Sequence, residues 1–266
     1  MTPLIMGVVN VTPDSFSDGG RFLDPAVAIE HGHQLVADGA DILDIGGEAT
    51  NPRATPITAD EELARVVPVL EGLRGCGAQL SIDTTKAAVA RAAVAAGATI
   101  VNDVSGGLFD PAMVAAVTEM PGVTYIAGHL RGHTLADVFA AEGTITWQDV
   151  AAELAERVAA FPVETRARVW IDPGVGFGKG SDPEGNLALL RNAGHIAAAV
   201  GRPVVVGPSR KRFLRRVIGE RGADAALHLD VASVAACLGA VRAGAVVVRA
   251  HNVALLRTAL AVYTNL

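Results

Sequence analysis

Short apolar segments recur along the whole chain, and each is followed by a polar turn and a longer stretch with helical periodicity. The apolar segments are too short to form helices and are rich in valine and isoleucine, which is typical of buried parallel strands. The predicted strands are residues 4–10, 41–46, 79–83, 99–103, 123–128, 168–172, 203–207 and 245–249. The predicted helices are residues 25–40, 59–74, 86–96, 111–119, 147–161, 186–200, 229–243 and 253–264.

The regular alternation of strands and helices predicts a (β/α)8 TIM barrel of the α/β class. A doubly wound open sheet is the alternative arrangement of the same elements. No proline-rich or low-complexity linker interrupts the series, so residues 1–266 are interpreted as a single domain. Thr58 and Glu61 have the spacing of a capping box at the start of the second helix.

Nearly every predicted strand ends in a polar side chain. These residues are Asn10, Asp44, Asp83, Asn102, Asp103, His129, Asp172, Lys211, Arg249 and His251. The carboxyl ends of all barrel strands meet at one mouth, where the active sites of such barrels lie, so we expect the set to converge on a polar ligand. A single member is explained equally well as a helix cap, as for Asp83 before the third helix.

One group of these strand-end residues accepts hydrogen bonds. Asp83, Asn102 and Asp172 suit a heterocycle with adjacent N–H groups, because a carboxylate accepts two parallel hydrogen bonds. The glycines of residues 172–179 permit a close approach of the backbone to such a ligand, and Phe177 offers a flat apolar face.

A second group provides donors on the last two strands, where barrels commonly bind phosphate. Lys211, Arg249 and His251 form this group. Arg210, Arg212, Arg215 and Arg216 surround Lys211, and for most of them a solvated helix face is the simplest interpretation.

The composition limits the partners and the compartment. The chain has 266 residues, of which 50% are hydrophobic and 19% charged, and its net charge is −6. This balance argues against binding to nucleic acid or to an anionic membrane. No uninterrupted apolar segment has the length of a membrane span, and the N-terminal residues lack a signal-peptide pattern. Cys76 and Cys237 are two unpatterned thiols, which favours a reducing, cytoplasmic location.

Seven motifs in order along the chain resemble those of the dihydropteroate synthase family. They are residues 6–20, 44–48, 81–84, 101–104, 172–179, 207–211 and 249–251. Members of this family are pterin-binding barrels that join 6-hydroxymethyl-7,8-dihydropterin diphosphate to p-aminobenzoate in folate biosynthesis. The resemblance implies a transferase that is a sulfonamide target, uses Mg²⁺, acts on small molecules without a covalent nucleophile and forms a homodimer through outer helices.

The resemblance also implies a role for each matching residue. The pterin-binding residues would be Asp83, Asn102, Asp172, Lys211 and Gly207. The diphosphate-binding residues would be Thr50, Arg249 and His251, with Asn10 as a ligand of Mg²⁺. The p-aminobenzoate-binding residues would be Thr50, Pro52, Phe177 and Ser209.

The chain departs from the family pattern at several positions. Asn51 replaces the usual arginine of the second loop, and Arg53 lies two residues further on. Asn252 replaces the aspartate that usually follows the last histidine, although asparagine can still cap the final helix. Leu130 stands where methionine is common, and Pro208 where a small or apolar residue is usual. These changes put turnover and inhibitor response in question more than the fold.

Two other functions fit parts of the pattern. A non-catalytic or divergent pterin-binding paralogue, with reduced sulfonamide sensitivity, would be compatible with Asn51 and Asn252. A methyltetrahydrofolate-dependent corrinoid methyltransferase shares the acceptor group, but it does not need the cationic residues of the last two strands. Dihydropteroate synthase activity accounts for both groups.

Overall fold

The computed structural model describes residues 2–12, 24–51, 55–140, 145–179, 182–219 and 225–266. Its eight strands form one parallel sheet in the order β6-β5-β4-β3-β2-β1-β8-β7. The strands are β1 (Leu4–Asn10), β2 (Ile42–Gly46), β3 (Gln79–Asp83), β4 (Ile100–Asp103), β5 (Thr124–Gly128), β6 (Val169–Asp172), β7 (Val205–Val206) and β8 (Val247–Ala250). A bridge between Ile171 and Val204 joins the two ends of the sheet, so the predicted barrel is confirmed and the open sheet is not formed.

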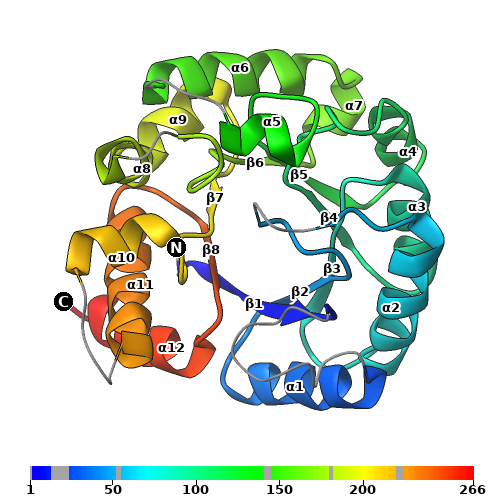
Figure 1. Cartoon of the computed structure of the whole chain (residues 1–266), viewed down its shortest axis with the longest axis horizontal. Coiled ribbons are helices and arrows are strands. Elements are labelled where there is room, and N and C mark those ends of the chain that lie inside the picture. Colours follow the sequence, from blue (N-terminus) through cyan, green and yellow to red (C-terminus); the bar gives the residue numbers. More distant parts are fainter. Residues whose placement is uncertain (1, 13–23, 52–54, 141–144, 180–181, 220–224) are drawn as a thin grey trace.

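Helices surround the ring of strands (Figure 1). The helices are α1 (Pro25–Ala37), α2 (Ala59–Gly72), α3 (Ala87–Ala95), α4 (Met113–Thr118), α5 (Leu135–Ala140), α6 (Trp147–Ala159), α7 (Val163–Arg166), α8 (Pro183–Arg191), α9 (Ala193–Val200), α10 (Arg212–Ile218), α11 (Ala225–Arg242) and α12 (Val253–Tyr263). The prediction of one helix over 186–200 is wrong, because the chain leaves helical geometry at Asn192, where φ is −110° and ψ is 18°. The short helices α5 and α7 were not predicted, and α10 was anticipated only as the helix face that carries Arg212, Arg215 and Arg216.

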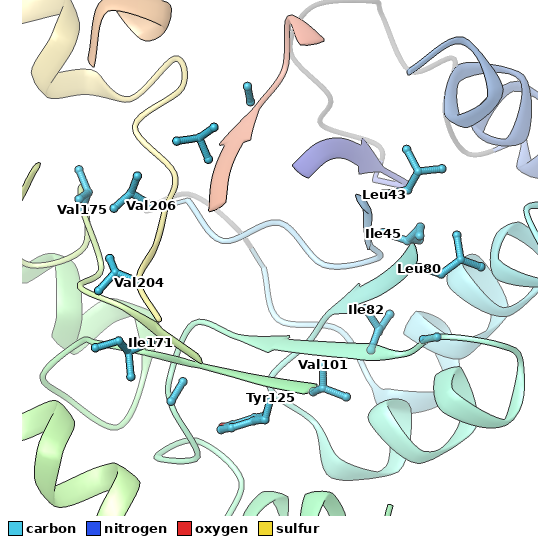
Figure 2. Packing of buried hydrophobic residues seen from close by; sticks show 14 of the residues in the cluster. Leu43, Ile45, Leu80, Ile82, Val101, Tyr125, Ile171, Val175, Val204 and Val206 are labelled. Carbon is cyan, nitrogen blue, oxygen red and sulfur yellow. The ribbon is translucent and has the colours of Figure 1, made fainter. Parts of the chain in front are cut away.

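The alternation of side chains along each strand separates two apolar clusters. The smaller cluster fills the lower part of the barrel interior and contains Met6, Ile42, Ile100, Ile126, Val205 and Val247. The larger cluster lies between the strands and the helices, and Figure 2 shows the part of it around Leu43, Ile82 and Val101. Because successive side chains point to opposite faces of a strand, residues two positions beyond the inner cluster also face the interior.

This alternation places a polar layer directly above the inner apolar cluster. Asp44 follows Ile42 by two residues, Asn102 follows Ile100, and Arg249 follows Val247. Asp172 follows Trp170, which packs against the same inner cluster. These four strand-end residues therefore converge at the carboxyl end of the barrel, as predicted. Asp103 and His129 of the predicted set point elsewhere, toward Tyr125 and Glu153.

Local signals in the sequence are reproduced at the helix termini. Thr58 and Glu61 form the predicted capping box of α2. Asp83 does not cap α3, because the backbone N–H of Ala87 at the start of that helix donates to Asp110 Oδ2 at 2.8 Å.

One helix of the described part of the chain, α11, is long and apolar enough to cross a membrane by length and composition alone. In the structure, α11 is one of the outer helices of the barrel and contacts α8, α10, α12 and β8. Its polar residues Asp230 and Ser233 are buried and hydrogen-bonded to Arg210. One side of α11 is therefore packed in the barrel, while Leu227 and Val231 on the same helix are exposed.

Candidate functional site

A buried carboxylate at β2 connects four strands of the barrel. Asp44 is fully buried, and its Oδ1 accepts a hydrogen bond from Ser81 Oγ at 2.7 Å. Its Oδ2 accepts from Asn102 Nδ2 at 3.0 Å and from Arg249 Nε at 2.5 Å. A buried ion is tolerated only when it is paired and hydrogen-bonded. Asp44 therefore fixes the relative positions of the interior side chains of β3, β4 and β8.

Arg249 extends this network to a second carboxylate. Its Nη2 donates to Asp83 Oδ2 at 2.8 Å, while Asp83 Oδ1 has no donor among the described residues. Burial, followed by the negative charge of Asp44, raises the pKa of Asp83, and the charge of Arg249 opposes this shift. Asp83 thus keeps one oxygen available to accept a hydrogen bond from a ligand in the mouth.

A third carboxylate and a lysine lie on β6 and at the start of α10. Asp172 Oδ1 accepts from the backbone N–H of Gly174 at 2.7 Å, and burial raises the pKa of this carboxyl group against the charge of Lys211. Lys211 Nζ donates to the carbonyl of Val175 and lies 4.2 Å from the centroid of the Phe177 ring. Burial lowers the pKa of Lys211 to about 8, and the charge of Asp172 opposes the shift.

The loop between Asp172 and Phe177 depends on two glycines. Gly174 has a φ of +71°, and a Cβ there would lie 1.8 Å from the carbonyl oxygen of His129. Gly176 has a φ of +86°, and a Cβ there would lie 2.5 Å from Lys211 Cδ. Because other residues would meet both steric clash and an unfavourable backbone geometry, glycine is required at each position.

Lys179 lies at the end of this loop and is buried against His129. Its buried Nζ donates to the carbonyl of Phe177 at 2.8 Å and contacts His129 Nδ1 at 3.1 Å. His129 Nε2 lies 3.1 Å from Glu153 Oε2, and burial lowers the pKa of the imidazole far below its usual value. A neutral His129 therefore donates to Glu153 and accepts from Lys179, and Lys179 acts as a support for the backbone that carries Phe177.

A serine and a histidine pair at the ends of β7 and β8. Ser209 Oγ lies 3.0 Å from His251 Nδ1 and accepts the backbone N–H of His251 at 3.2 Å. Burial and the charges of Arg249 and Arg210 lower the pKa of His251 to about 3. His251 is therefore neutral at pH 7, and its pairing with Ser209 favours the tautomer that carries its proton on Nε2.

The polar layer thus combines three carboxylates with Arg249 and Lys211. Comparison with known proteins shows which family has this site: residues 6–251 match the model of the family described as pterin binding enzyme. The chain belongs to the pterin-binding enzyme family. It is 46% identical to the dihydropteroate synthase of Mycobacterium leprae in an alignment of 231 positions that covers 84% of this chain and 78% of that protein.

Solved structures of family members have the same fold. The dihydropteroate synthase of Xanthomonas albilineans with 4-aminobenzoic acid is 40% identical, with a TM-score of 0.84, over 99% of this chain and 93% of that chain. The dihydropteroate synthase of Burkholderia cenocepacia complexed with 7,8-dihydropteroate is 38% identical, with a TM-score of 0.84, over 99% of this chain and 91% of that chain.

The structure brings most of the site residues predicted from the family together, and their individual roles stay predictions. Asp83, Asn102, Asp172, Lys211, Gly207, Arg249, His251, Ser209 and Phe177 all lie at the carboxyl end of the barrel. Gly207 lies against Arg249, because a Cβ added at Gly207 would be 3.5 Å from Arg249 Cβ. Asn10 and Thr50 are half-buried at the ends of their strand and loop. Pro52 and Arg53 lie outside the described residues.

Two departures from the family pattern are explained by their surroundings. Asn252 Oδ1 accepts from the backbone N–H of Leu255 at 3.1 Å and so caps α12, as predicted. Its Nδ2 donates to Asp230 Oδ2 at 3.0 Å. An aspartate at this position would keep the cap but lose the donor. Leu130, the second departure, is fully buried, and leucine and methionine are both apolar side chains of similar volume suited to such a position.

We expect the substitution Asn252→Asp to lower the free energy of unfolding by about 1 kcal/mol at pH 7, because two carboxylates would then face each other without a shared proton. Urea unfolding measures this effect. The loss should shrink as the pH falls and one carboxylate is protonated. A loss of the same size in Asn252→Asp at pH 7 and at acidic pH would contradict the explanation.

Three contributors to the site were not assigned a role from the sequence. Ser81 holds Asp44, Lys179 supports the glycine loop, and Asp230 binds Arg210. Arg210 is therefore an exception to the predicted solvated face. For Asp230 a signal existed: Asp230 and Ser233 are two polar residues three positions apart on an otherwise apolar helix face.

Proposed function

We propose that the protein is a dihydropteroate synthase, which condenses 6-hydroxymethyl-7,8-dihydropterin diphosphate with p-aminobenzoate to give 7,8-dihydropteroate and diphosphate. The observation that carries this proposal is the convergence of Asp83, Asn102 and Asp172 with Lys211 and Arg249 in one polar layer. The membership in the pterin-binding family and the dihydropteroate synthases among the relatives support it.

The acceptor group is suited to the pterin ring. Asp83 Oδ1, which has no donor within the described part of the chain, and the carboxylate of Asp172 accept hydrogen bonds from the amino and ring N–H groups of a pterin. Asn102 is fixed by its hydrogen bond to Asp44, so its amide group has one orientation. Lys211 supplies a donor on the other edge of the ring. These contacts hold the pterin methylene at the mouth, where the second substrate enters.

The donors of the last two strands are suited to the leaving diphosphate. The amine nitrogen of p-aminobenzoate forms a bond to the pterin methylene carbon, the C–O bond to diphosphate breaks, and the amine loses a proton. Arg249 stabilises the negative charge that develops on the leaving oxygens, and neutral His251 contributes a hydrogen bond from Nε2. An aryl amine is already nucleophilic, so no covalent enzyme intermediate is required.

We propose that p-aminobenzoate lies between Phe177 and Ser209. The Phe177 ring lies 4.2 Å from Lys211 Nζ and, between ring centroids, 6.0 Å from Phe139. Its flat aromatic ring supplies apolar surface for the aryl ring. Thr50 and Pro52, which the family resemblance also assigns to this substrate, remain part of the proposal.

The residues of the site fit a Mg²⁺ ion that is bound together with diphosphate. Among the described residues there is no cluster of three or more His, Cys, Asp or Glu side chains suited to a metal ion. Mg²⁺ usually takes only one or two protein oxygens together with substrate phosphates and water. The amide of Asn10 makes no hydrogen bond with the other described residues, so its oxygen is free to serve as that ligand. Bound Mg²⁺ would neutralise charge on the diphosphate.

The activity itself is tested by incubating the purified protein with the pterin diphosphate, p-aminobenzoate and Mg²⁺. We expect equal amounts of dihydropteroate and diphosphate to form. Binding of pteroic acid without any product at high enzyme concentration would instead favour a non-catalytic pterin-binding paralogue. The same assay tests whether Asn51, in place of the usual arginine, reduces sulfonamide sensitivity. The quantity to measure is the sulfonamide concentration that halves the rate of dihydropteroate formation.

The pH dependence of the reaction should follow Lys211. Its pKa is lowered to about 8, so kcat/KM for the pterin diphosphate should decline as the pH rises through about 8 and the lysine loses its charge. In Lys211→Arg this decline should move to higher pH, because arginine stays protonated. A decline that keeps its position in Lys211→Arg would assign the titration to another group, such as Lys179, whose pKa is lowered to about 7 by burial.

We also propose a homodimer in the cytoplasm. Leu227 and Val231 on α11 and Val262 on α12 are exposed apolar side chains on neighbouring helices, which is the expected character of a subunit interface. We expect Val231→Lys to convert dimers to monomers in sedimentation analysis. Val163→Lys, at an exposed valine of α7, is the matched control and should leave the dimer intact. A wild-type monomer would contradict this assignment.

A further inference from the structure

Arg210 has an unusual backbone conformation between two predicted site residues. Its φ is +58°, and it is the only non-glycine residue with positive φ in the described part of the chain. Ser209 precedes it and Lys211 follows it. A left-handed conformation is unfavourable for a residue with a Cβ and persists only where the surroundings determine it strongly.

Two polar residues of α11 supply these surroundings. The backbone N–H of Arg210 donates to Ser233 Oγ at 2.9 Å. The guanidinium donates to both oxygens of Asp230, through Nε at 2.7 Å and Nη2 at 3.0 Å. The Asp230 side chain is 9% exposed. This bidentate pairing fixes the plane of the guanidinium as well as its distance from α11.

Asp230 is in turn held by the following strand-end segment. Asn252 Nδ2 donates to Asp230 Oδ2 at 3.0 Å, directly after His251 in the chain. Burial opposes ionisation of Asp230, but the hydrogen bonds from Arg210 and Asn252 lower its pKa below the usual value. One carboxylate on α11 therefore joins the segments that follow β7 and β8.

The position of Arg210 determines where its two neighbours point. On one side the hydroxyl of Ser209 contacts the imidazole of His251, and on the other the Lys211 side chain reaches Val175 and Phe177. Any change in the backbone at Arg210 alters the direction of both side chains, because they flank it in the chain.

We propose that Asp230 is a positioning residue of the site: through Arg210 it fixes the orientations of Ser209 and Lys211 toward the substrates. This inference rests on the proposed function. It also accounts for Asn252, whose amide donates to Asp230 where the aspartate usual in the family would not. Asp230 contacts both Arg210 and Asn252, and the proposal assigns its effect on catalysis to the contact with Arg210.

The test uses four variants of the full-length protein. Asp230→Asn removes the charge and keeps the shape. Arg210→Gly removes the guanidinium and keeps a residue that accepts positive φ. The double variant combines these two changes. Glu184→Gln is the matched control, because Glu184 forms an ion pair with Arg191 that is exposed on both sides and lies on α8.

We expect Asp230→Asn and Arg210→Gly each to lower kcat/KM for dihydropteroate formation by about tenfold or more. The double variant should have a kcat/KM no lower than that of the less active single variant. Glu184→Gln should stay within about twofold of wild type. Calorimetric titration with pteroic acid should show the same order of affinities. Thermal unfolding of every variant separates this effect from loss of the fold.

Two outcomes would overturn the proposal. One is an Asp230→Asn variant that matches Glu184→Gln in both rate and affinity. The other is an equal further loss when Asp230→Asn is added to Arg210→Gly, since this would show that Asp230 does not act through Arg210. If Asp230→Asn fails to fold, Ser233→Ala takes its place. It removes the acceptor of the Arg210 N–H together with a hydrogen bond to the carbonyl of Leu229 inside α11. Wild-type kinetics in that variant would refute the proposal that α11 positions Ser209 and Lys211 through Arg210.

Failure of the proposed function gives a different result. A wild-type protein that binds pteroic acid but forms no dihydropteroate would refute the proposed activity. The affinities of the variants for pteroic acid would still decide whether Asp230 positions the site.

Discussion

Replacing Arg249 by methionine is expected to lower the free energy of unfolding by about 3–5 kcal/mol at neutral pH, and to abolish dihydropteroate formation. Arg249 is the cationic partner of both Asp44 and Asp83, and Asp44 is fully buried. Methionine has a similar length but no charge, so both carboxylates would stay in the barrel interior without a counter-ion. Urea unfolding, monitored at several pH values, measures the loss.

The pH dependence of this effect has a definite sign. The pKa of Asp83 is already raised in the folded protein, so the folded state binds a proton more tightly than the unfolded state, and stability falls as the pH rises through the folded pKa. Removal of Arg249 raises this pKa further. The deficit of Arg249→Met should therefore shrink as the pH is lowered.

A double variant separates stability from activity. Arg249→Met combined with Asp83→Asn should recover part of the lost stability, because one uncompensated charge is gone, but it should not recover activity. A loss of unfolding free energy in Arg249→Met below about 1 kcal/mol, or one that does not change with pH, would contradict this prediction. It would show that solvent already screens the charges of Asp44 and Asp83.

The substitution Asp172→Asn is expected to lower kcat/KM for the pterin diphosphate by about 100-fold, because it removes charge-assisted hydrogen bonds to the N–H groups of the ring. The KM for p-aminobenzoate should change much less. Steady-state kinetics with each substrate varied in turn measures both quantities. An equal effect on both substrates would contradict the assignment of Asp172 to the pterin.

Asp103 offers a matched control at the end of β4. It is fully buried but faces away from the mouth, where its oxygens accept hydrogen bonds from Ser105, Gly107 and the Tyr125 hydroxyl. Asp103→Asn should therefore lower the free energy of unfolding by about 2 kcal/mol, since an amide nitrogen cannot accept these bonds. Its affinity for pteroic acid should stay near that of wild type.

The strands and their polar ends were predicted well because both depend on local pattern. Alternation with a period of two sets which side chain faces the interior, so Ile100 and Asn102 share a face in any barrel that uses this strand. The helices α5 and α7 were missed because six and four residues are too few to show a helical repeat of apolar positions. The break at Asn192 was missed because apolar residues continue with helical spacing on both sides of it.

The arrangement of charges in the site could not be predicted in the same way. Arg249 is predicted to bind an anionic ligand, and the structure adds that two of its guanidinium nitrogens already donate to Asp44 and Asp83. His251 was assigned to the anion site as a cation or a donor, and burial makes it a neutral donor. Both outcomes depend on the depth at which each strand end lies in the barrel, which no local pattern specifies.

The sequence by itself determined the barrel, the polar character of its carboxyl end and the family. These properties follow from periodicity and from motifs that are contiguous in the chain. Only the tertiary structure decided which charges meet: Arg249 and Asp44 are 205 positions apart, and Arg210 and Asp230 are joined across a strand end and a helix. Such pairs depend on the stagger of strands and the packing of helices, because a buried ion takes the partner that the fold places beside it.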